Sequence, residues 1–229
     1  GMMRGGIYDQ VGGGFARYST DRQWLVPHFE KMLYDNAQLL DVYATGYRVF
    51  GDENYREVVE RTYDYMVRDL GHPEGAFYSS QDAESDGEEG KYYVWTDEEF
   101  RDVLGEDADL LADFWDVTPD GNFEGKSILH RIQSIQDFCD QRSLDVDDFK
   151  ETLASAREKL LEAREEREKP HLDDKVLTSW NGLALAACAR AGFILDEEKY
   201  VERATAGLEF LLDEMVEDGD IVILDKREM

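Results

Sequence analysis

The chain has 229 residues, enough for one large domain or two small ones and long enough to bury a hydrophobic core. It carries 53 acidic against 25 basic residues, a formal net charge of −28. A surface this acidic repels nucleic acid and anionic membranes, so we expect neither as a partner. No apolar run approaches the roughly 20 residues that span a bilayer. The two cysteines, Cys139 and Cys188, lie far apart, which indicates a reducing, cytoplasmic location without a disulfide.

The acidic residues are spread along the whole chain, in stretches such as EDADLLAD, DVDDF and VEDGD. Solvated helix faces would explain them simply. A protein from a high-salt cytoplasm would also show them, because acidic surface keeps such a protein soluble while salt screens its self-repulsion. We favour this halophilic interpretation, since an acidic tail or a binding patch would concentrate the charge.

Residues 5–30 mix glycines with alternating aromatic residues, which predicts a short β-hairpin of Phe15–Ser19 and Gln23–Val26. Pro27 fits the start of a helix. From Lys31 the pattern is helical, and Gly51 ends this first helix. A second helix follows the short linker GDEN, so the two helices should form an antiparallel pair. The stripe that defines the first helix is Leu33, Ala37, Leu40, Ala44 and Tyr47.

The middle of the chain breaks this pattern. Ala76–Ser79 and Lys91–Trp95 are predicted to be strands around an acidic loop, followed by short helices near 97–104 and 107–115. TPDGNFEGKSIL has the composition of a loop. A long amphipathic helix is predicted from Val146 to about Glu168, because Pro170 marks its limit.

Two helices complete the pattern. The segment DDKVLTSWNGLALAACARAGFIL is predicted to be a loop that leads into an alanine-rich, buried helix, and DEEKYVERATAGLEFLLDEM contains the last clear helix. Helical hairpins with short loops on one side and elaborated loops on the other are typical of a toroid. We therefore predict an all-α protein, an incomplete (α/α) toroid of helical hairpins with small β-hairpins. The pattern alone leaves a bundle or a solenoid open.

The segment WLVPHFEK places titratable groups where the first helix is expected to begin. His28, Glu30 and Lys31 lie beside Trp24 and other apolar residues, so the imidazole should be partly shielded from water. Helix capping and a surface ion pair would explain these residues. The sharper hypothesis is that His28 faces a pocket and transfers protons, with Glu30 as a second catalytic group and with Trp24 and Lys31 as substrate contacts.

The segment DAESDGEEGK begins like an EF-hand loop, with Asp82, Glu84, Asp86 and Gly87. The closing glutamate would fall at Tyr93, and the flanks resemble strands, so calcium binding is not expected. The carboxylates of Asp82 and Glu84 could line a polar pocket, or the segment could be a solvated loop tip. The glycines of VGGGFARY lack a following GK[ST], and close backbone packing or turns explain them better than a phosphate loop.

The segment DDKVLTSWNG offers Asp173, Asp174 and Lys175, followed by Trp180 and Asn181 in the first turn of the buried helix. An aromatic face beside carboxylates and an amide is a common way to hold a sugar ring. A helix cap and an ordinary core tryptophan are the competing explanation. No HxxxH or HxH spacing occurs, so we expect no metal site.

Three segments together carry a resemblance: GGIYDQVGGGFARYSTDRQWLVPHFEKMLYDNAQL, FYSSQDAESDGEEGKYYVWT and DDKVLTSWNGLALAACARAG. In this order they closely resemble the YyaL / spermatogenesis-associated protein 20 family, over most of residues 5–195. The resemblance implies a thioredoxin-like N-terminal domain followed by a six-hairpin (α/α) toroid similar to N-acylglucosamine 2-epimerase and related glycosidases.

The chain departs from this family pattern at both ends. We expect that it starts inside the toroid, without the thioredoxin-like domain, and that it ends near DGDIVILDKREM after too few helices for six hairpins. We therefore expect one partial toroid domain over residues 1–229. A thioredoxin-like domain or an oligomer could complete it.

Two classes of function remain open. The first is a sugar-active enzyme without a cofactor. It would be an epimerase or isomerase using His28 and an acidic partner, or a glycosidase using two carboxylates among Asp82, Glu84, Asp173 and Asp174. The second is a non-catalytic carbohydrate-binding or scaffold domain that partners a thioredoxin-like domain. Either function requires the three segments to converge at one end of the toroid and to bind a small-molecule sugar.

The halophilic interpretation predicts salt-dependent stability. Dense acidic charge repels itself, and salt relieves the repulsion because the Debye length falls to about 10 Å at 0.1 M. We expect the melting temperature to rise from low to molar salt in thermal denaturation followed by circular dichroism. A melting temperature that stays flat over this range would contradict the interpretation.

Overall fold

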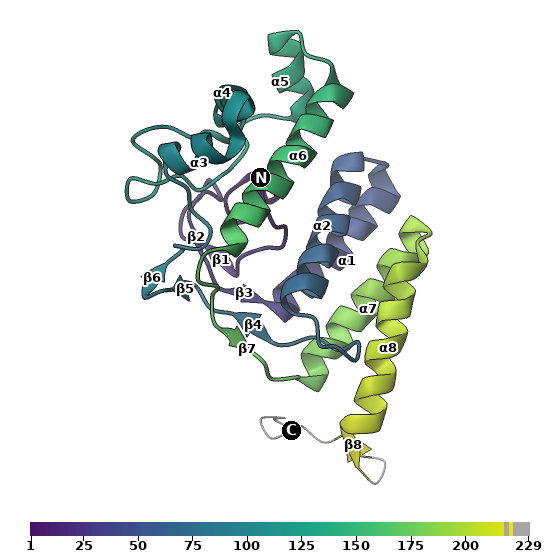
Figure 1. The fold of residues 1–229 in the computed structure, drawn as a ribbon. Helices are drawn as coiled ribbons and strands as arrows, with labels where there is room; N and C mark the ends of the chain where they lie inside the picture. Colours follow the sequence, from purple (N-terminus) through teal and green to yellow (C-terminus); the bar gives the residue numbers. More distant parts are fainter. Residues whose placement is uncertain (218–219, 222–229) are drawn as a thin grey trace. The chain divides into compact units, whose positions relative to one another are not determined.

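The computed structural model describes residues 1–217 and 220–221 (Figure 1). Its internal contacts group the chain into two compact units. Unit 1 comprises Gly1–Gly12, Ala16–Phe29 and Ala83–Pro170, and unit 2 comprises Gly13–Phe15, Glu30–Asp82 and His171–Met229. Most of the sequence expected to end the toroid, 218–219 and 222–229, lies outside the described residues. The single toroid domain over 1–229 stays a prediction.

Unit 2 is built from two helical hairpins. The first joins α1 (Leu33–Phe50) to α2 (Glu53–Asp69), and the second joins α7 (Thr178–Leu195) to α8 (Glu198–Glu214). Helix α1 packs against α2 and α7, and α7 packs against α8 (Figure 1). Gly51 ends α1 in the left-handed conformation at φ 64°, where a glycine is favoured. A short strand pair, β8 (Val216–Glu217) and β9 (Asp220–Ile221), follows α8. The predicted helices and their short connection are confirmed.

The core of unit 2 depends on small residues in α7. Ala184, Ala187, Cys188 and Ala191 are all buried, so neighbouring helices can approach α7 closely. Burial also raises the pKa of the Cys188 thiol to about 12, which keeps it protonated and unreactive. The large side chains that surround this helix include Leu33, Leu40, Val59, Met66, Phe77, Tyr200 and Leu211.

Two asparagines lock the starts of α1 and α7 in the same way. Asn36 and Asn181 are each the fourth residue of their helix, and both are fully buried. Asn36 Oδ1 accepts from Phe15 N at 2.7 Å, and Asn36 Nδ2 donates to Phe15 O at 3.0 Å. Asn181 makes the equivalent pair with Phe77, at 2.7 and 2.9 Å. Each amide also donates to the carbonyl four residues earlier, so the two hairpins repeat one local design.

A three-stranded antiparallel sheet lies at the starts of α1 and α7. Its strands are β3 (Lys31–Met32), β4 (Ser80–Gln81) and β7 (Leu172–Asp173), in the order β3-β4-β7. Lys31 pairs with Gln81 and Met32 with Ser80. The prediction that Pro27 begins a helix is wrong: Pro27 lies in a strand, and α1 begins only after β3.

Gly13 and Gly14 pack closely against α2, which confirms for these two glycines the close backbone packing expected from the sequence. Gly13 and Gly14 both have φ of 77°, a conformation that favours glycine. A Cβ on Gly13 would lie 2.2 Å from Arg61 O, and a Cβ on Gly14 would lie 2.3 Å from the Tyr65 ring. Close backbone packing therefore requires both glycines.

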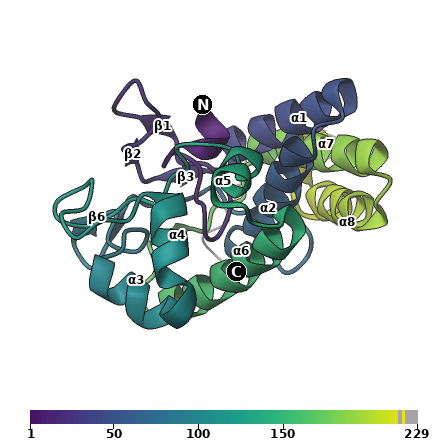
Figure 2. The ribbon, with the colours of Figure 1, turned by 90° about the horizontal axis from the view of Figure 1, so that it is seen from above.

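Unit 1 combines short strands with helices (Figure 2). The helices are α3 (Asp97–Leu104), α4 (Ala108–Trp115), α5 (Ile135–Arg142) and α6 (Val146–Glu165), with single 3₁₀ turns η1 (Met2–Arg4) and η2 (Gly105–Asp107). Their core is rich in aromatic residues, among them Trp95, Phe100, Phe114, Trp115, Phe138 and Phe149. A capping box of Thr96 and Glu99 starts α3. Helices α3, α4 and α6 confirm the sequence analysis, whereas it did not include α5.

The first predicted hairpin exists in altered form. Strand β1 (Tyr18–Ser19) pairs with β2 (Pro27–His28), and Gln23–Val26 forms the connecting turn instead of a strand. The cause is Asp21, whose carboxylate accepts hydrogen bonds from the backbone N–H groups of Gln23, Leu25 and Val26. These are the groups that a strand would use for its own pairing.

The second predicted hairpin is wrong. Ala76–Ser79 and Lys91–Trp95 do not pair with each other, because the chain uses Ser80–Gln81 in the sheet of unit 2. A smaller hairpin, β5 (Glu84–Ser85) with β6 (Glu88–Glu89), forms in unit 1. Its two turn residues, Asp86 and Gly87, have φ of 51° and 74°, the signs that a tight type I′ turn requires.

The asparagine locks generate a stability prediction. Asn36→Ala or Asn181→Ala should each lower the free energy of unfolding by roughly 2–4 kcal/mol, because buried backbone groups lose their partners. Chemical denaturation measures this. Gln38→Ala is the control, since exposed Gln38 bonds only to Tyr34 O, and it should change stability by less than about 0.5 kcal/mol. Equal effects of all three substitutions would contradict the proposed locks.

Candidate functional site

Unit 2 contains an open polar cavity of about 490 Å³. It lies over the β3-β4-β7 sheet, at the end of the unit where α1 and α7 begin. Its lining is almost wholly polar: Glu30, Ser80, Asp82, His171, Asp173, Asp174 and Lys175. Five of the eleven residues nominated from sequence are therefore brought together here.

The register of the sheet explains this gathering. Successive side chains of a strand point to opposite faces, and directly paired residues share a face. Ser80 pairs with Asp173. One step further along the same antiparallel registers, Asp82 comes opposite both Glu30 and His171. Asp82 N donates to His171 O at 2.9 Å, which holds this second row in place. The two rows place three carboxylates and an imidazole on the face of the cavity.

The opposite face of the sheet turns into the core. Lys31 is only 3% exposed, its Nζ donates to Gly13 O at 3.0 Å, and it lies 4.4 Å from the centroid of the Tyr65 ring. Gln81 is buried beside it and accepts from Tyr65 Oη at 3.1 Å. Lys31 was expected to contact substrate. The structure instead uses its cation inside the fold, because its strand position points away from the cavity.

Asp173 and Lys175 form an ion pair at the edge of the cavity, with Nζ to Oδ2 at 2.9 Å. Burial raises the pKa of Asp173, but hydrogen bonds from Lys175 and Ser79 and the charge of Lys175 outweigh it, so the net pKa is lowered. Asp173 therefore stays ionised and suits the role of an acceptor or base rather than that of an acid.

His171 is the residue that sequence reasoning missed. It stands beside Pro170 in what reads as a polar loop, whereas the apolar surroundings of His28 made that histidine the preferred candidate. Only the pairing of β4 with β7 brings His171 next to Asp82. The sequence held one signal, the position of His171 two residues before Asp173. Alternation would put the two side chains on one face if the segment were known to be a strand.

The electrostatics of the cavity combine four carboxylates with one ammonium group. Helices α1 and α7 both begin at this end of unit 2, and the positive ends of their dipoles offset part of the negative charge. Within residues 1–217 and 220–221, no group of three or more His, Cys, Asp or Glu side chains is arranged to hold a metal ion.

His28, Glu84 and Trp24 belong to unit 1 and do not line this cavity. His28 lies in β2, with Nδ1 at 2.7 Å from Glu89 Oε1, and its ring stacks on Tyr18. Glu84 is exposed in β5, opposite Glu89. Trp24 is 39% exposed and has a positive φ of 66°. The roles assigned to these three residues stay predictions.

Trp180 and Asn181 belong to unit 2, but they do not line the cavity either. The Trp180 ring packs edge-on against Tyr34, with centroids 4.7 Å apart, and is partly buried against the core. Asn181 has no exposed surface, and its amide is occupied by Phe77 and Leu177. The substrate role expected of Asn181 does not fit this burial, because its polar atoms serve the fold.

Comparisons with known proteins place the chain among homologous sequences. Human spermatogenesis-associated protein 20 is 41% identical over 92% of this chain, and an uncharacterised protein of Caenorhabditis elegans is 33% identical over 96%. A cellobiose 2-epimerase of Bacteroides fragilis is 36% identical over 61 residues, 27% of this chain. A sugar epimerase structure from a ruminal bacterium aligns over 93% of the chain with a TM-score of 0.29 and 13% identity, too weak to support a structural conclusion. No family model matches the chain.

The chain is thus a homologue of one segment of larger proteins, since it spans 30% of the human relative and 34% of the nematode relative. It belongs to the spermatogenesis-associated protein 20 family, as the three sequence segments indicated. Within the described residues, no helix combines the length and the apolar character needed to cross a membrane.

The Asp173–Lys175 pair generates a titration prediction. Lys175→Met should raise the pKa of Asp173, because burial keeps raising it while the opposing charge is gone. Carboxyl chemical shifts in an NMR titration measure this. The folded-state pKa of the wild type lies below the ordinary value of 3.8, so the pair stabilises the fold above that pH and loses its contribution as the pH falls. An unchanged pKa in the variant would show that Lys175 does not act on Asp173.

Proposed function

We propose that the cavity of unit 2 binds a small sugar and that His171 and the neighbouring carboxylates perform acid/base chemistry on it, as in a sugar epimerase or isomerase. The observation that carries this proposal is the shared sheet face, on which the register aligns Glu30, Asp82, His171 and Asp173. Carboxylates and an ammonium group are suitable partners for sugar hydroxyls. An open polar cavity of about 490 Å³ has room for a mono- or disaccharide.

Epimerisation next to a carbonyl requires a base that removes a proton from carbon and an acid that returns one. An imidazole can do both near neutral pH. Asp82 lies opposite His171 in the sheet and can orient or charge-balance the ring, while Asp173 stays ionised and can accept a hydroxyl proton or a hydrogen bond. These residues therefore supply the groups that the reaction needs.

A glycosidase is the weaker enzyme hypothesis. Its general acid needs a carboxyl group whose pKa is raised. The pKa of Asp173 is lowered, so this carboxyl group does not suit the role of the acid. Proton transfer by His171 does not depend on such a group.

Two further observations support a carbohydrate-related fold. One is the 61-residue likeness to a cellobiose 2-epimerase. The other is the repeated design of the α1/α2 and α7/α8 hairpins, each locked by a buried asparagine at its first turn. We propose that they are hairpins of an (α/α) toroid. A thioredoxin-like domain as a partner also remains a proposal.

The alternative is a non-catalytic carbohydrate-binding or scaffold domain. The Asp173–Lys175 contact is an ordinary ion pair that needs no reaction to explain it, which favours this alternative. Within the described part of the chain, Phe, Tyr and Trp side chains, the usual platform for a sugar ring, do not line the cavity, which counts against it. Exchange of the sugar proton with solvent separates the two hypotheses.

We predict that a thermal-shift screen of mono- and disaccharides in molar salt identifies a ligand. The protein should then incorporate deuterium at the carbon next to the sugar carbonyl in D₂O, as seen by NMR. His171→Gln should slow this exchange by about 100-fold or more, because a general base is lost. Its melting temperature should stay nearly unchanged, since His171 is exposed.

His28→Gln is the matched comparison, because both substitutions replace one histidine by the same amide. Loss of exchange only in the His28 variant would show that the general base is His28 in unit 1 and would contradict the role of His171. Ligand binding without exchange in the wild type would establish the binding-domain alternative. Absence of any sugar ligand would refute the proposed function.

A further inference from the structure

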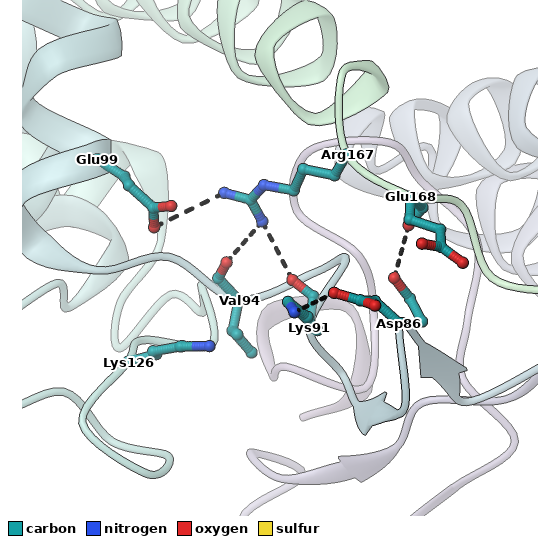
Figure 3. Close-up of a pocket in the computed structure, with 8 residues that line it drawn as sticks. Asp86, Lys91, Val94, Glu99, Lys126, Arg167 and Glu168 are labelled. Carbon is teal, nitrogen blue, oxygen red and sulfur yellow. Dashed lines mark hydrogen bonds and ion pairs between the residues drawn. The ribbon is translucent and has the colours of Figure 1, made fainter.

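Unit 1 has a separate cavity of about 250 Å³ that the sugar proposal does not use (Figure 3). Cations from three segments line it, Lys91, Lys126 and Arg167, although the chain holds only 25 lysines and arginines against 53 acids. Asp86, Glu99 and Glu168 line it as well, together with Ser85 and Val94. The question is which of these charges remain available to a ligand.

Arg167 is held rigidly at the cavity. Its guanidinium stacks on Trp95 at 4.0 Å from the ring, and Nη1 donates to the carbonyls of Lys91, Tyr92 and Val94 at 3.3, 3.1 and 2.8 Å. Nη2 is therefore fixed in direction, and its nearest carboxylate oxygen, on Glu99, lies 3.9 Å away, beyond hydrogen-bond distance. Burial lowers the pKa of Arg167. The negative charge of Glu99 raises this pKa, but the net shift is downward, so Glu99 compensates the cation only partly.

Lys126 is in a similar state. Its Nζ lies 3.7 Å from Glu88 Oε2, again beyond hydrogen-bond distance, and in Figure 3 the side chain extends into the cavity. Two of the three carboxylates that line the cavity, in contrast, already accept hydrogen bonds. Asp86 accepts from Lys91 Nζ at 2.6 Å, and Glu99 Oε2 accepts from the backbone and side chain of Thr96 at 3.0 and 2.9 Å. Two cationic donors, Arg167 Nη2 and Lys126 Nζ, therefore lie at the cavity with their paired carboxylates beyond hydrogen-bond distance.

We propose that this cavity is a binding site for a phosphate group, held between Arg167 Nη2 and Lys126 Nζ. A phosphate presents several strong acceptor oxygens, which suits one fixed guanidinium donor and one mobile ammonium group. The cavity is larger than a phosphate ion, and Val94 adds an apolar wall, so a small phosphate monoester fits the same chemistry. The site lies wholly within unit 1 and is independent of the function proposed for unit 2.

The test is isothermal titration of the whole chain with inorganic phosphate at constant ionic strength, with chloride as the balancing anion. We expect saturable binding of one phosphate per chain. Lys126→Met should weaken it by about tenfold or more, since one charge-assisted hydrogen bond is lost. Lys159→Met removes the same charge from α6 outside the cavity and should leave the affinity within about twofold.

Glu99→Gln provides a test in the opposite direction. Glutamine preserves the capping box of α3, so the fold is retained. Without its charge, residue 99 no longer competes for Arg167, and phosphate affinity should rise several-fold. Unchanged or weaker binding in this variant, no saturable binding in the wild type, or equal losses in the two lysine variants would each overturn the site. Tighter binding of glycerol phosphate than of inorganic phosphate would identify a monoester as its occupant, and equal affinity would identify the free ion.

Discussion

The register of the β3-β4-β7 sheet is the constraint on which unit 2 depends. Its strands are only two residues long, yet they join three segments that are far apart in the sequence. One face of the sheet carries the acidic groups and His171, while the other buries Lys31 and Gln81. A shift of one residue would exchange the two faces and bury the carboxylates without partners, at a high cost in free energy. The same register therefore fixes both the core and the cavity.

Buried side-chain amides make such short strands sufficient. Asn36 and Asn181 tie Phe15 and Phe77 to the first turns of α1 and α7, so the segments beside the sheet are ordered by hydrogen bonds that do not belong to any strand. Buried backbone groups require partners, and a fixed asparagine supplies a donor and an acceptor at once. The loops around this sheet can then hold polar residues in fixed positions although the strands themselves are short.

The two cavities use the acidic chain in different ways. In unit 2, carboxylates outnumber the single ammonium group, and the dipoles of α1 and α7 moderate the charge, which suits a neutral ligand rich in hydroxyl groups. In unit 1, three cations are concentrated in one place, and two of the three nearby carboxylates, those of Asp86 and Glu99, already accept hydrogen bonds. Because the chain has a net charge of −28, a local cluster of cations indicates an anion-binding site more strongly than it would in a protein with equal numbers of acidic and basic residues.

The sequence by itself determined most of the helices and the family, because periodic apolar stripes, Gly51 and the long motifs are local features. It also nominated Asp82, Asp173, Asp174 and Lys175, which line one cavity, because polar residues gather in elaborated loops. Only the tertiary structure decided which of them meet. The pairing of strands two residues long leaves no local pattern, so the sequence could not show that Lys31 and Asn181 turn inward or that His171 joins Asp82. Nor could it show that Asp21 folds Gln23–Val26 into a turn, because that depends on where one carboxylate finds its donors.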